Sequence, residues 1–308
     1  MISQDKILKD GRLHIFLLGS GGPMNNNLRV ASSIAIIAEN EFTLIDVGPG
    51  SYRNADVLRL PVANLSAIFL THFHSDHIGD LGEANMMSWA TGRAKALEVY
   101  GPPGVEQVVK GFIMAYELDT GYRIAHHGED TIIPEAGTPI IKTIELQDPN
   151  ERELIFNKNE LMVYAFEVDH APIRPAFGYR IEYKEKIVVI TGDTVKTENL
   201  VKHCENADIL FSEAISYEML NNLVAGAKRL ELYRFAKILT DIQNYHMEPV
   251  VAAEVAKEAK VKKLIIIHIT PPITNEIAEK IYMKSVGDIF EGEVILGKDC
   301  MKFKLDPK

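Results

Sequence analysis

Three histidines and two aspartates crowd into the ten residues THFHSDHIGD at positions 71–80, directly after the apolar run 67–70. His72 and His74 are two residues apart and therefore face the same side of an extended backbone, while Asp76 and His77 follow in the turn. Neutral imidazole and carboxylate are the nitrogen and oxygen ligands that zinc prefers. Four such groups within six residues exceed what one catalytic metal with an open position needs, so the pattern predicts two neighbouring metals.

Two plainer explanations compete with a binuclear centre. The histidines could be solvated loop residues, or they could hold a single structural metal. A structural zinc usually involves cysteine ligands. The two cysteines, Cys204 and Cys300, are both remote from this segment in sequence. The position of the cluster after a buried strand favours a catalytic site.

Metal-type side chains also follow three later strand candidates. Asp169 and His170 come after residues 161–168, Asp193 after 187–190, and His268 after 264–267. One histidine at a strand end means little, but the same pattern at four strand ends is hard to obtain by chance. We therefore expect these strand ends to share one site.

The segments THFHSDH, VDH, TGDT and IIIHITPP occur in this order and resemble the motifs of the metallo-β-lactamase superfamily. The resemblance runs from about residue 13 to residue 270. It implies an α/β fold, a four-layer αββα sandwich, with two zinc ions per chain; manganese or iron stays open. It also implies three ligands for each metal and one bridging carboxylate: His72, His74 and His170; Asp76, His77 and His268; and Asp193 between them.

Within the superfamily, two branches are similar to this sequence. LLGSGGP, RVASS and VDHAPIRPAFGYRIE resemble ribonuclease Z, as do ILFSEAI, which contains Glu213, and the segment from His246 to the last ligand. Three other segments are more similar to the arylsulfatase-like members: HIGDLGEANMMSWATGR, VYGPPGV and AHHGE. His126 and His127 in AHHGE are equally consistent with surface positions and with a substrate pocket.

The predicted reaction is hydrolysis of an anionic ester, either a phosphodiester or an aryl sulfate. A hydroxide between two zinc ions is a strong nucleophile near neutral pH, and the metals neutralise the ester's charge. The leaving oxygen needs a proton, which we assign to His246 held by Glu213. Asp46 is expected to support a ligand by hydrogen bonding. The predicted catalytic residues are His246, Glu213 and Asp76, the last of which is also a ligand.

The sequence determines the substrate less well than it determines the reaction. Ribonuclease Z grips transfer RNA with a protruding arm, which in many bacterial forms precedes the GDT motif. Only residues 171–192 separate His170 from Asp193 here, which leaves no room for that arm. The net charge of −10 also argues against a broad basic face for nucleic acid. We therefore expect a small anionic ester, with nucleic acid not favoured. Transfer-RNA 3′ processing is the alternative, followed by a non-catalytic metal sensor.

Short apolar runs and helical patterns alternate along the chain, which indicates sheets covered by helices. The 308 residues, 46% hydrophobic, are predicted to form a single domain, 1–308, with possible elaborations at 92–137 and 217–242. We expect no membrane partner and no targeting segment, and a homodimer stays open. Two cysteines outside any CxxC pattern indicate reduced thiols in a cytoplasmic protein.

The strand candidates are 13–18, 33–37, 42–45, 67–70, 97–100, 161–168, 177–182, 187–190, 209–211 and 264–267. The helix candidates are 79–89, 105–117, 194–203, 217–242, 250–259 and 275–284.

Overall fold

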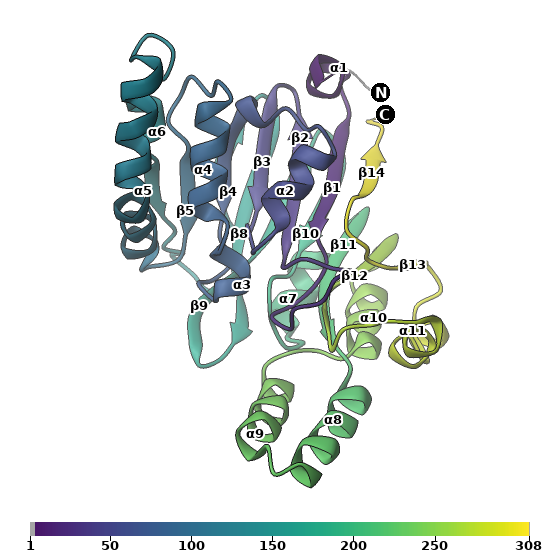
Figure 1. Cartoon of the computed structure of the whole chain (residues 1–308). Coiled ribbons are helices and arrows are strands. Elements are labelled where there is room, and N and C mark those ends of the chain that lie inside the picture. The colour runs from purple at the N-terminus through teal and green to yellow at the C-terminus, as the bar shows by residue number, and fades with distance from the viewer. Residues whose placement is uncertain (1–3, 308) are drawn as a thin grey trace.

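The computed structural model describes residues 4–307. Two seven-stranded sheets pack face to face, and helices cover both outer faces (Figure 1). The predicted four-layer αββα sandwich is confirmed. Every predicted strand is present, with ends that shift by at most a few residues.

The first sheet has the strand order β14-β1-β2-β3-β4-β5-β6. The strands from β14 to β3 pair in antiparallel fashion, and those from β3 to β6 are parallel. Its members are β1 (Leu13–Gly19), β2 (Ser33–Ala38), β3 (Glu41–Ile45), β4 (Leu65–Phe69), β5 (Glu98–Gly101), β6 (Ile140–Thr143) and β14 (Met301–Leu305).

The second sheet has the order β13-β12-β11-β10-β9-β8-β7. It is parallel from β10 to β13 and antiparallel from β7 to β10. Its members are β7 (Glu153–Lys158), β8 (Leu161–His170), β9 (Ile173–Tyr183), β10 (Lys186–Ile190), β11 (Ile209–Ile215), β12 (Lys263–Thr270) and β13 (Glu293–Leu296).

Strand β1 shows why the runs are continuously apolar. Leu13, Ile15 and Leu17 point into the core between the sheets, whereas Phe16 and Leu18 pack under the outer helices. A strand that is buried on both faces favours apolar residues at nearly every position. The exception in β1 is the buried His14, which bonds to Asp10. The inter-sheet core and two outer cores hold the layers together.

Helices on the first sheet include α1 (Gln4–Lys9), α2 (Ser51–Val57), α4 (Leu81–Ala90) and α5 (Val105–His127). Those on the second sheet are α7 (Glu198–Cys204), α10 (Pro249–Glu258), α11 (Glu276–Tyr282) and α12 (Val286–Ile289). Short turns of helix are α3 (Ser75–Ile78), α6 (Pro134–Gly137), η1 (Val62–Asn64) and η2 (Ile242–Asn244). None of the helices in the part of the chain that the structure describes is both long and apolar enough to cross a membrane.

The single helix predicted over 217–242 is wrong. The chain forms two helices, α8 (Tyr217–Arg229) and α9 (Tyr233–Asp241), which fold back on each other and project from the sandwich (Figure 1). Glu231, between them, has a φ of 59°, a left-handed value that a continuing helix does not allow. The segment KRLEL contains neither glycine nor proline, so no sequence signal marked the break. One domain with two elaborations stays a prediction.

Candidate metal centre

The four strands that carry predicted ligands, β4, β8, β10 and β12, bring those side chains together at one edge of the sandwich. Hydrogen bonds tie the sheets there: Phe177 on β9 donates its N–H to the Thr71 carbonyl at 3.0 Å. The Tyr179 hydroxyl donates to the Leu70 carbonyl at 2.6 Å. The loop after β4 is therefore fixed against the opposite sheet.

Seven predicted ligands form two adjacent groups. In the first, the possible ligand atoms of His72, His74, His170 and Asp193 all lie within 4.8 Å of one another. A second group with the same property consists of Asp76, His77 and His268. This division matches the ligand split that the superfamily resemblance implies, and the assignment of each ligand to a metal remains a prediction.

The Asp193 carboxylate lies between the two groups. Its Oδ2 is 3.3 Å from Nε2 of both His77 and His268 in the second group. The same oxygen lies 3.7 Å from Nε2 of His72 and 3.9 Å from Nε2 of His170 in the first group. A carboxylate in this position can reach cations on both sides.

The donor atoms of these residues fit divalent cations. His77 Nε2, His170 Nε2 and Asp193 Oδ1 are buried and have no hydrogen-bond partner among residues 4–307. Buried polar atoms without a partner are costly and rare in native proteins. Imidazole nitrogen and carboxylate oxygen are ligands for zinc and similar metals. Metal ions would satisfy these atoms.

Asp46 supports the centre, as the sequence suggested. Its carboxylate accepts a hydrogen bond from Nδ1 of His77 at 2.7 Å and two from Thr71, through the N–H at 2.8 Å and the hydroxyl at 2.9 Å. A carboxylate behind a histidine fixes the ring so that the other nitrogen faces the metal.

The backbone at two of these residues is also unusual: Asp46 and His268 have φ values of 54° and 52°. Such left-handed values are uncommon outside glycine and cluster at functional sites.

Replacing Asp46 with asparagine is expected to lower metal affinity and activity by about 10–100-fold, the usual effect of losing an outer partner of a ligand. Titrating metal into the chelator-stripped variant, with turnover in parallel, measures the effect. Asp10→Asn is the matched control, because Asp10 accepts a hydrogen bond at 2.9 Å from His14, which lies outside the metal centre. Equal metal affinity of Asp46→Asn and the unmodified protein would contradict this role.

Two further residues support the ligands without any distinctive signal in the sequence. Thr71, next to the first ligand, places its hydroxyl 3.0 Å from Nδ1 of His72. The Tyr245 carbonyl accepts a hydrogen bond from Nδ1 of His170 at 3.1 Å. A threonine at a strand end and a backbone carbonyl carry no distinctive sequence signal, so only the fold reveals them.

His246 and Glu213 meet beside the centre. Nδ1 of His246 lies 3.3 Å from Oε2 of Glu213. Burial lowers the pKa of His246, but the nearby Glu213 carboxylate and the charge of Asp193 together raise it to about 9. The other carboxylate oxygen, Oε1, accepts backbone hydrogen bonds from Thr194 at 3.2 Å and Met247 at 3.0 Å. Glu213 therefore fixes both the segment after Asp193 and the segment that presents His246.

His246 also lies within reach of the metal ligands. Its ring stacks on that of His268 with centroids 5.2 Å apart, and its nitrogen belongs to a third close group with Asp193 and His268. Geometry alone therefore allows His246 either to bind metal or to act on the substrate. Its neighbour Glu213 favours the second role, because the carboxylate stabilises a protonated ring.

The glycine-rich segment GSGG at positions 19–22 lies beside His268. A Cβ on Gly22 would stand 2.5 Å from Oγ1 of Thr270 and 3.0 Å from Cε1 of His268. No side chain fits between the loop and these residues. The loop is thus a close-packed wall of the site.

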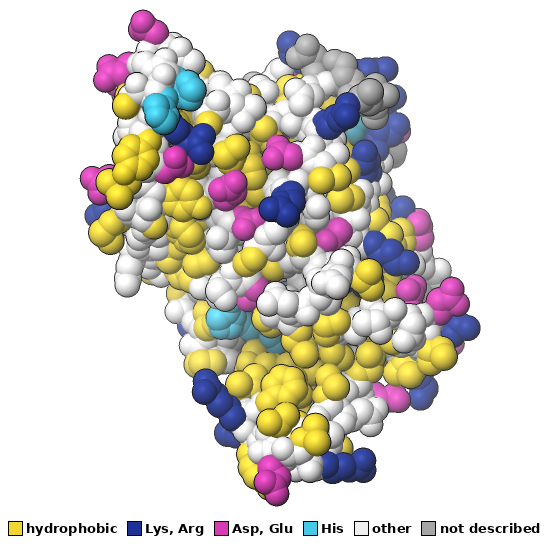
Figure 2. All heavy atoms as spheres, in the orientation of Figure 1, with side chains coloured by type: hydrophobic (Ala, Val, Ile, Leu, Met, Phe, Trp, Pro, Cys, Tyr) yellow, Lys and Arg dark blue, Asp and Glu magenta, His cyan; other side chains and the backbone are white. Residues whose placement is uncertain are grey.

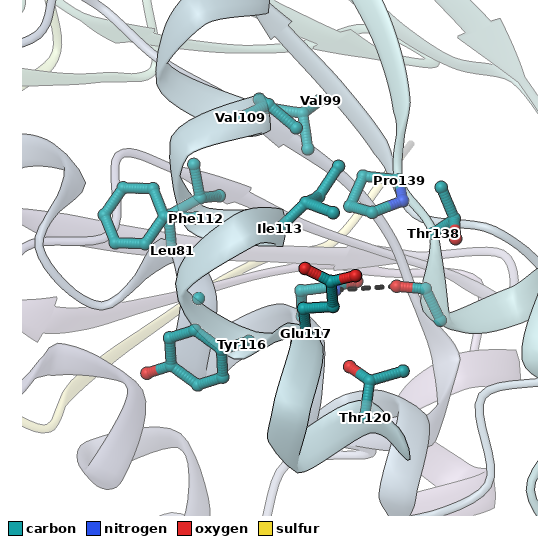
Figure 3. A pocket seen from close by; sticks show the side chains of 13 residues that line it. Leu81, Val99, Val109, Phe112, Ile113, Tyr116, Glu117, Thr120, Thr138 and Pro139 are labelled. Carbon is teal, nitrogen blue, oxygen red and sulfur yellow. Dashed lines mark hydrogen bonds between the residues drawn. The ribbon is translucent and has the colours of Figure 1, made fainter. Parts of the chain in front are cut away.

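A cavity of about 220 Å³ lies between α4 and α5 (Figure 3), and none of the predicted metal ligands lines it. Val109, Phe112 and Ile113 line it with apolar surface, and Asn85 donates a hydrogen bond to the Gly137 carbonyl at its edge. The cavity contains none of the three groups of metal-type side chains found in the described chain. His126 and His127 end helix α5 as exposed residues and belong to none of these groups either.

Known proteins are similar to this chain in sequence and in fold. The profile of the beta-lactamase superfamily domain matches residues 43–269. The chain is 31% identical over 299 residues to "Ribonuclease Z" of Mycobacterium bovis, covering 96% of this chain and 99% of the relative. It is 30% identical to "Ribonuclease Z" of Mycolicibacterium gilvum, covering 96% and 97%.

Solved structures agree on the fold. The short form of human tRNase Z superposes with a TM-score of 0.67 at 23% identity, covering 94% of this chain and 98% of that one. The metallo-beta-lactamase fold protein YhfI from Bacillus subtilis gives 0.66 at 20% identity, covering 96% and 100%. At these identities the comparison establishes the fold alone.

The expected substrate, a small anionic ester with nucleic acid not favoured, is wrong in the light of the ribonuclease Z relatives, which match nearly the whole chain. Two observations misled that expectation. A net charge of −10 is a sum over the surface and does not exclude local basic regions. The missing arm before Asp193 excludes one RNA-gripping element and no other.

Four observations support the same family assignment: the order of the motifs, the convergence of the predicted ligands, the αββα sandwich and the relatives that match nearly the full length. The chain belongs to the metallo-β-lactamase superfamily of metal-dependent hydrolases and, within it, to the ribonuclease Z-like family.

Proposed function

We propose that this protein is a ribonuclease Z-type endonuclease that hydrolyses an RNA phosphodiester, with the 3′ trailer of a precursor transfer RNA as its target. The observation that carries the proposal is the 31% identity to a ribonuclease Z over 96% of the chain. The site geometry supports it, because seven metal-type side chains and the His246–Glu213 pair lie together. A protein that only stored or sensed metal would have no use for that pair.

His72, His74 and His170 would hold one cation and Asp76, His77 and His268 the other, with Asp193 shared. We propose zinc for both, since the donors are imidazole and carboxylate. Two such cations supply Lewis acidity, which activates water and neutralises the charge of the phosphate. The chain itself positions the ligands through Asp46, Thr71 and the Tyr245 carbonyl.

Cleavage of the phosphodiester releases a ribose oxygen, which is a poor leaving group without a proton. The protonated ring of His246 donates that proton as the P–O bond breaks, and water supplies the oxygen that the phosphate gains. Glu213 keeps the ring oriented and charged through the contact between Oε2 and Nδ1. Because Glu213 acts through His246, it is a positioning residue.

The metal-loaded protein is expected to cut a precursor transfer RNA carrying a 3′ trailer at a single position, leaving a 3′-hydroxyl on the upstream product. Gel mapping of end-labelled RNA identifies the position and the ends. A mature transfer RNA without trailer is the substrate control, and His246→Ala is the enzyme control. If protein with its full metal content leaves every RNA intact, the proposed function fails.

A further inference from the structure

The α8–α9 hairpin projects from the sandwich next to the candidate centre (Figure 1). Its helices pack on each other through a small cluster that includes Leu220, Val224, Ala236 and Leu239. The hairpin begins after β11, which carries Glu213, and ends before His246. The Tyr217 hydroxyl at its base contacts the Gln243 and His246 carbonyls, each at 2.6 Å. The hairpin is thus anchored to the segment that presents the proposed proton donor.

Large apolar side chains remain exposed on this hairpin. Figure 2 shows them gathered over its surface, beside the histidines of the site. Tyr233 is 66% exposed and Phe235 is 41% exposed. Exposed apolar patches of this kind mark interaction surfaces. Other exposed members are Leu223, Leu230, Leu232 and Ile238.

Basic side chains are interleaved with the two aromatic residues. Segment 217–241 holds four basic and three acidic residues, in a chain whose net charge is −10. Lys237 pairs with Asp241 at 2.7 Å. Lys228, Arg229 and Arg234 are exposed, and across residues 4–307 no carboxylate forms an ion pair with them. The hairpin therefore offers unpaired positive charge beside exposed aromatic rings.

We propose that the α8–α9 hairpin binds a single-stranded segment of the RNA substrate and holds it for cleavage. This inference rests on the proposed function. Bases stack on aromatic side chains without strict sequence preference, and neighbouring cations contact the phosphates. A second copy of the chain fits the surface less well, because a symmetric contact would bring the same unpaired cations together. The hairpin would take the place of the arm that is missing before Asp193.

The experiment compares two double variants of the metal-loaded protein, Tyr233→Ala/Phe235→Ala and Arg229→Ala/Arg234→Ala. Each is expected to raise KM for a 3′-extended RNA by about tenfold or more, because the first variant loses base stacking and the second loses phosphate contacts. The arginine variant should also flatten the dependence of KM on salt, because fewer counterions are released on binding. Hydrolysis of bis(4-nitrophenyl) phosphate, which has no chain to grip, reports whether the catalytic centre is intact.

Tyr122→Ala/Arg123→Ala on α5 is the control, since Tyr122 is 59% exposed and the variant removes one residue of each kind, an aromatic ring and a cation, from a helix outside the hairpin. Tyr233→Phe/Phe235→Tyr should restore the normal KM. An unchanged KM in both double variants overturns the inference. So does an altered oligomeric mass with unchanged KM, which would assign the surface to self-association. Failure of the unmodified protein to cleave RNA is a separate result, which refutes the proposed function before any variant is made.

Discussion

Asp193→Ala is expected to remove metal and abolish hydrolysis together. The Asp193 carboxylate lies within 3.9 Å of nitrogens from both ligand groups, so its loss weakens both positions. The fall in turnover should exceed the roughly 100-fold that loss of an outer hydrogen-bond partner costs. Elemental analysis should drop from about two equivalents per chain, as expected for a two-metal site, to one or none.

The control for this variant is Asp119→Ala. Asp119 pairs with Arg123 on α5, at 3.1 Å and outside the centre, so its removal should leave metal content and turnover unchanged. Circular dichroism of Asp193→Ala checks that the sandwich still forms. Two retained equivalents in Asp193→Ala would exclude a bridging role. A single equivalent in the unmodified protein, even after metal is supplied, would exclude a binuclear centre.

The location of the candidate centre could be predicted because the side chains that could bind metal stand at the ends of predicted strands. Metal-type side chains follow apolar runs at His72, His170, Asp193 and His268. The carboxyl ends of these four strands meet at one edge of the sandwich, although no two of the strands are adjacent in a sheet. The supporting contacts could not be predicted in the same way. The Tyr245 carbonyl and the Glu213 bonds to backbone N–H groups depend on loop conformations, which side-chain patterns do not encode.

The secondary structure likewise has parts that the sequence predicts and parts that it does not. Buried strands such as β1 and β12 consist mainly of apolar residues, so the sequence predicts them. The edge strands β6 and β14 are only partly buried, so their apolar pattern is too weak to predict them from the sequence. The sequence gives no sign of the break between α8 and α9, because the left-handed residue there is Glu231 and not a glycine. Local signals are weakest where tertiary packing decides the conformation.

His246→Ala is expected to keep its metals and lose turnover. General acid assistance is typically worth about 10²–10⁴-fold, so RNA cleavage should fall within that range. Nitrophenolate scarcely needs a proton when it leaves, so the loss should be much smaller with bis(4-nitrophenyl) phosphate. Metal content and both rates are measured on the same preparation. Loss of a metal equivalent would make His246 a ligand, which its place in a close group with Asp193 and His268 permits.

Glu213→Gln tests whether the two residues act as a unit. The amide keeps a carbonyl oxygen for the Thr194 and Met247 N–H groups but removes the charge that raises the pKa of His246. RNA cleavage should fall by less than in His246→Ala, and the double variant should be no worse than His246→Ala alone. Glu213→Ala, which also frees both N–H groups, should in addition weaken metal binding near Asp193. Fully additive losses in the double variant would show that Glu213 acts independently of His246.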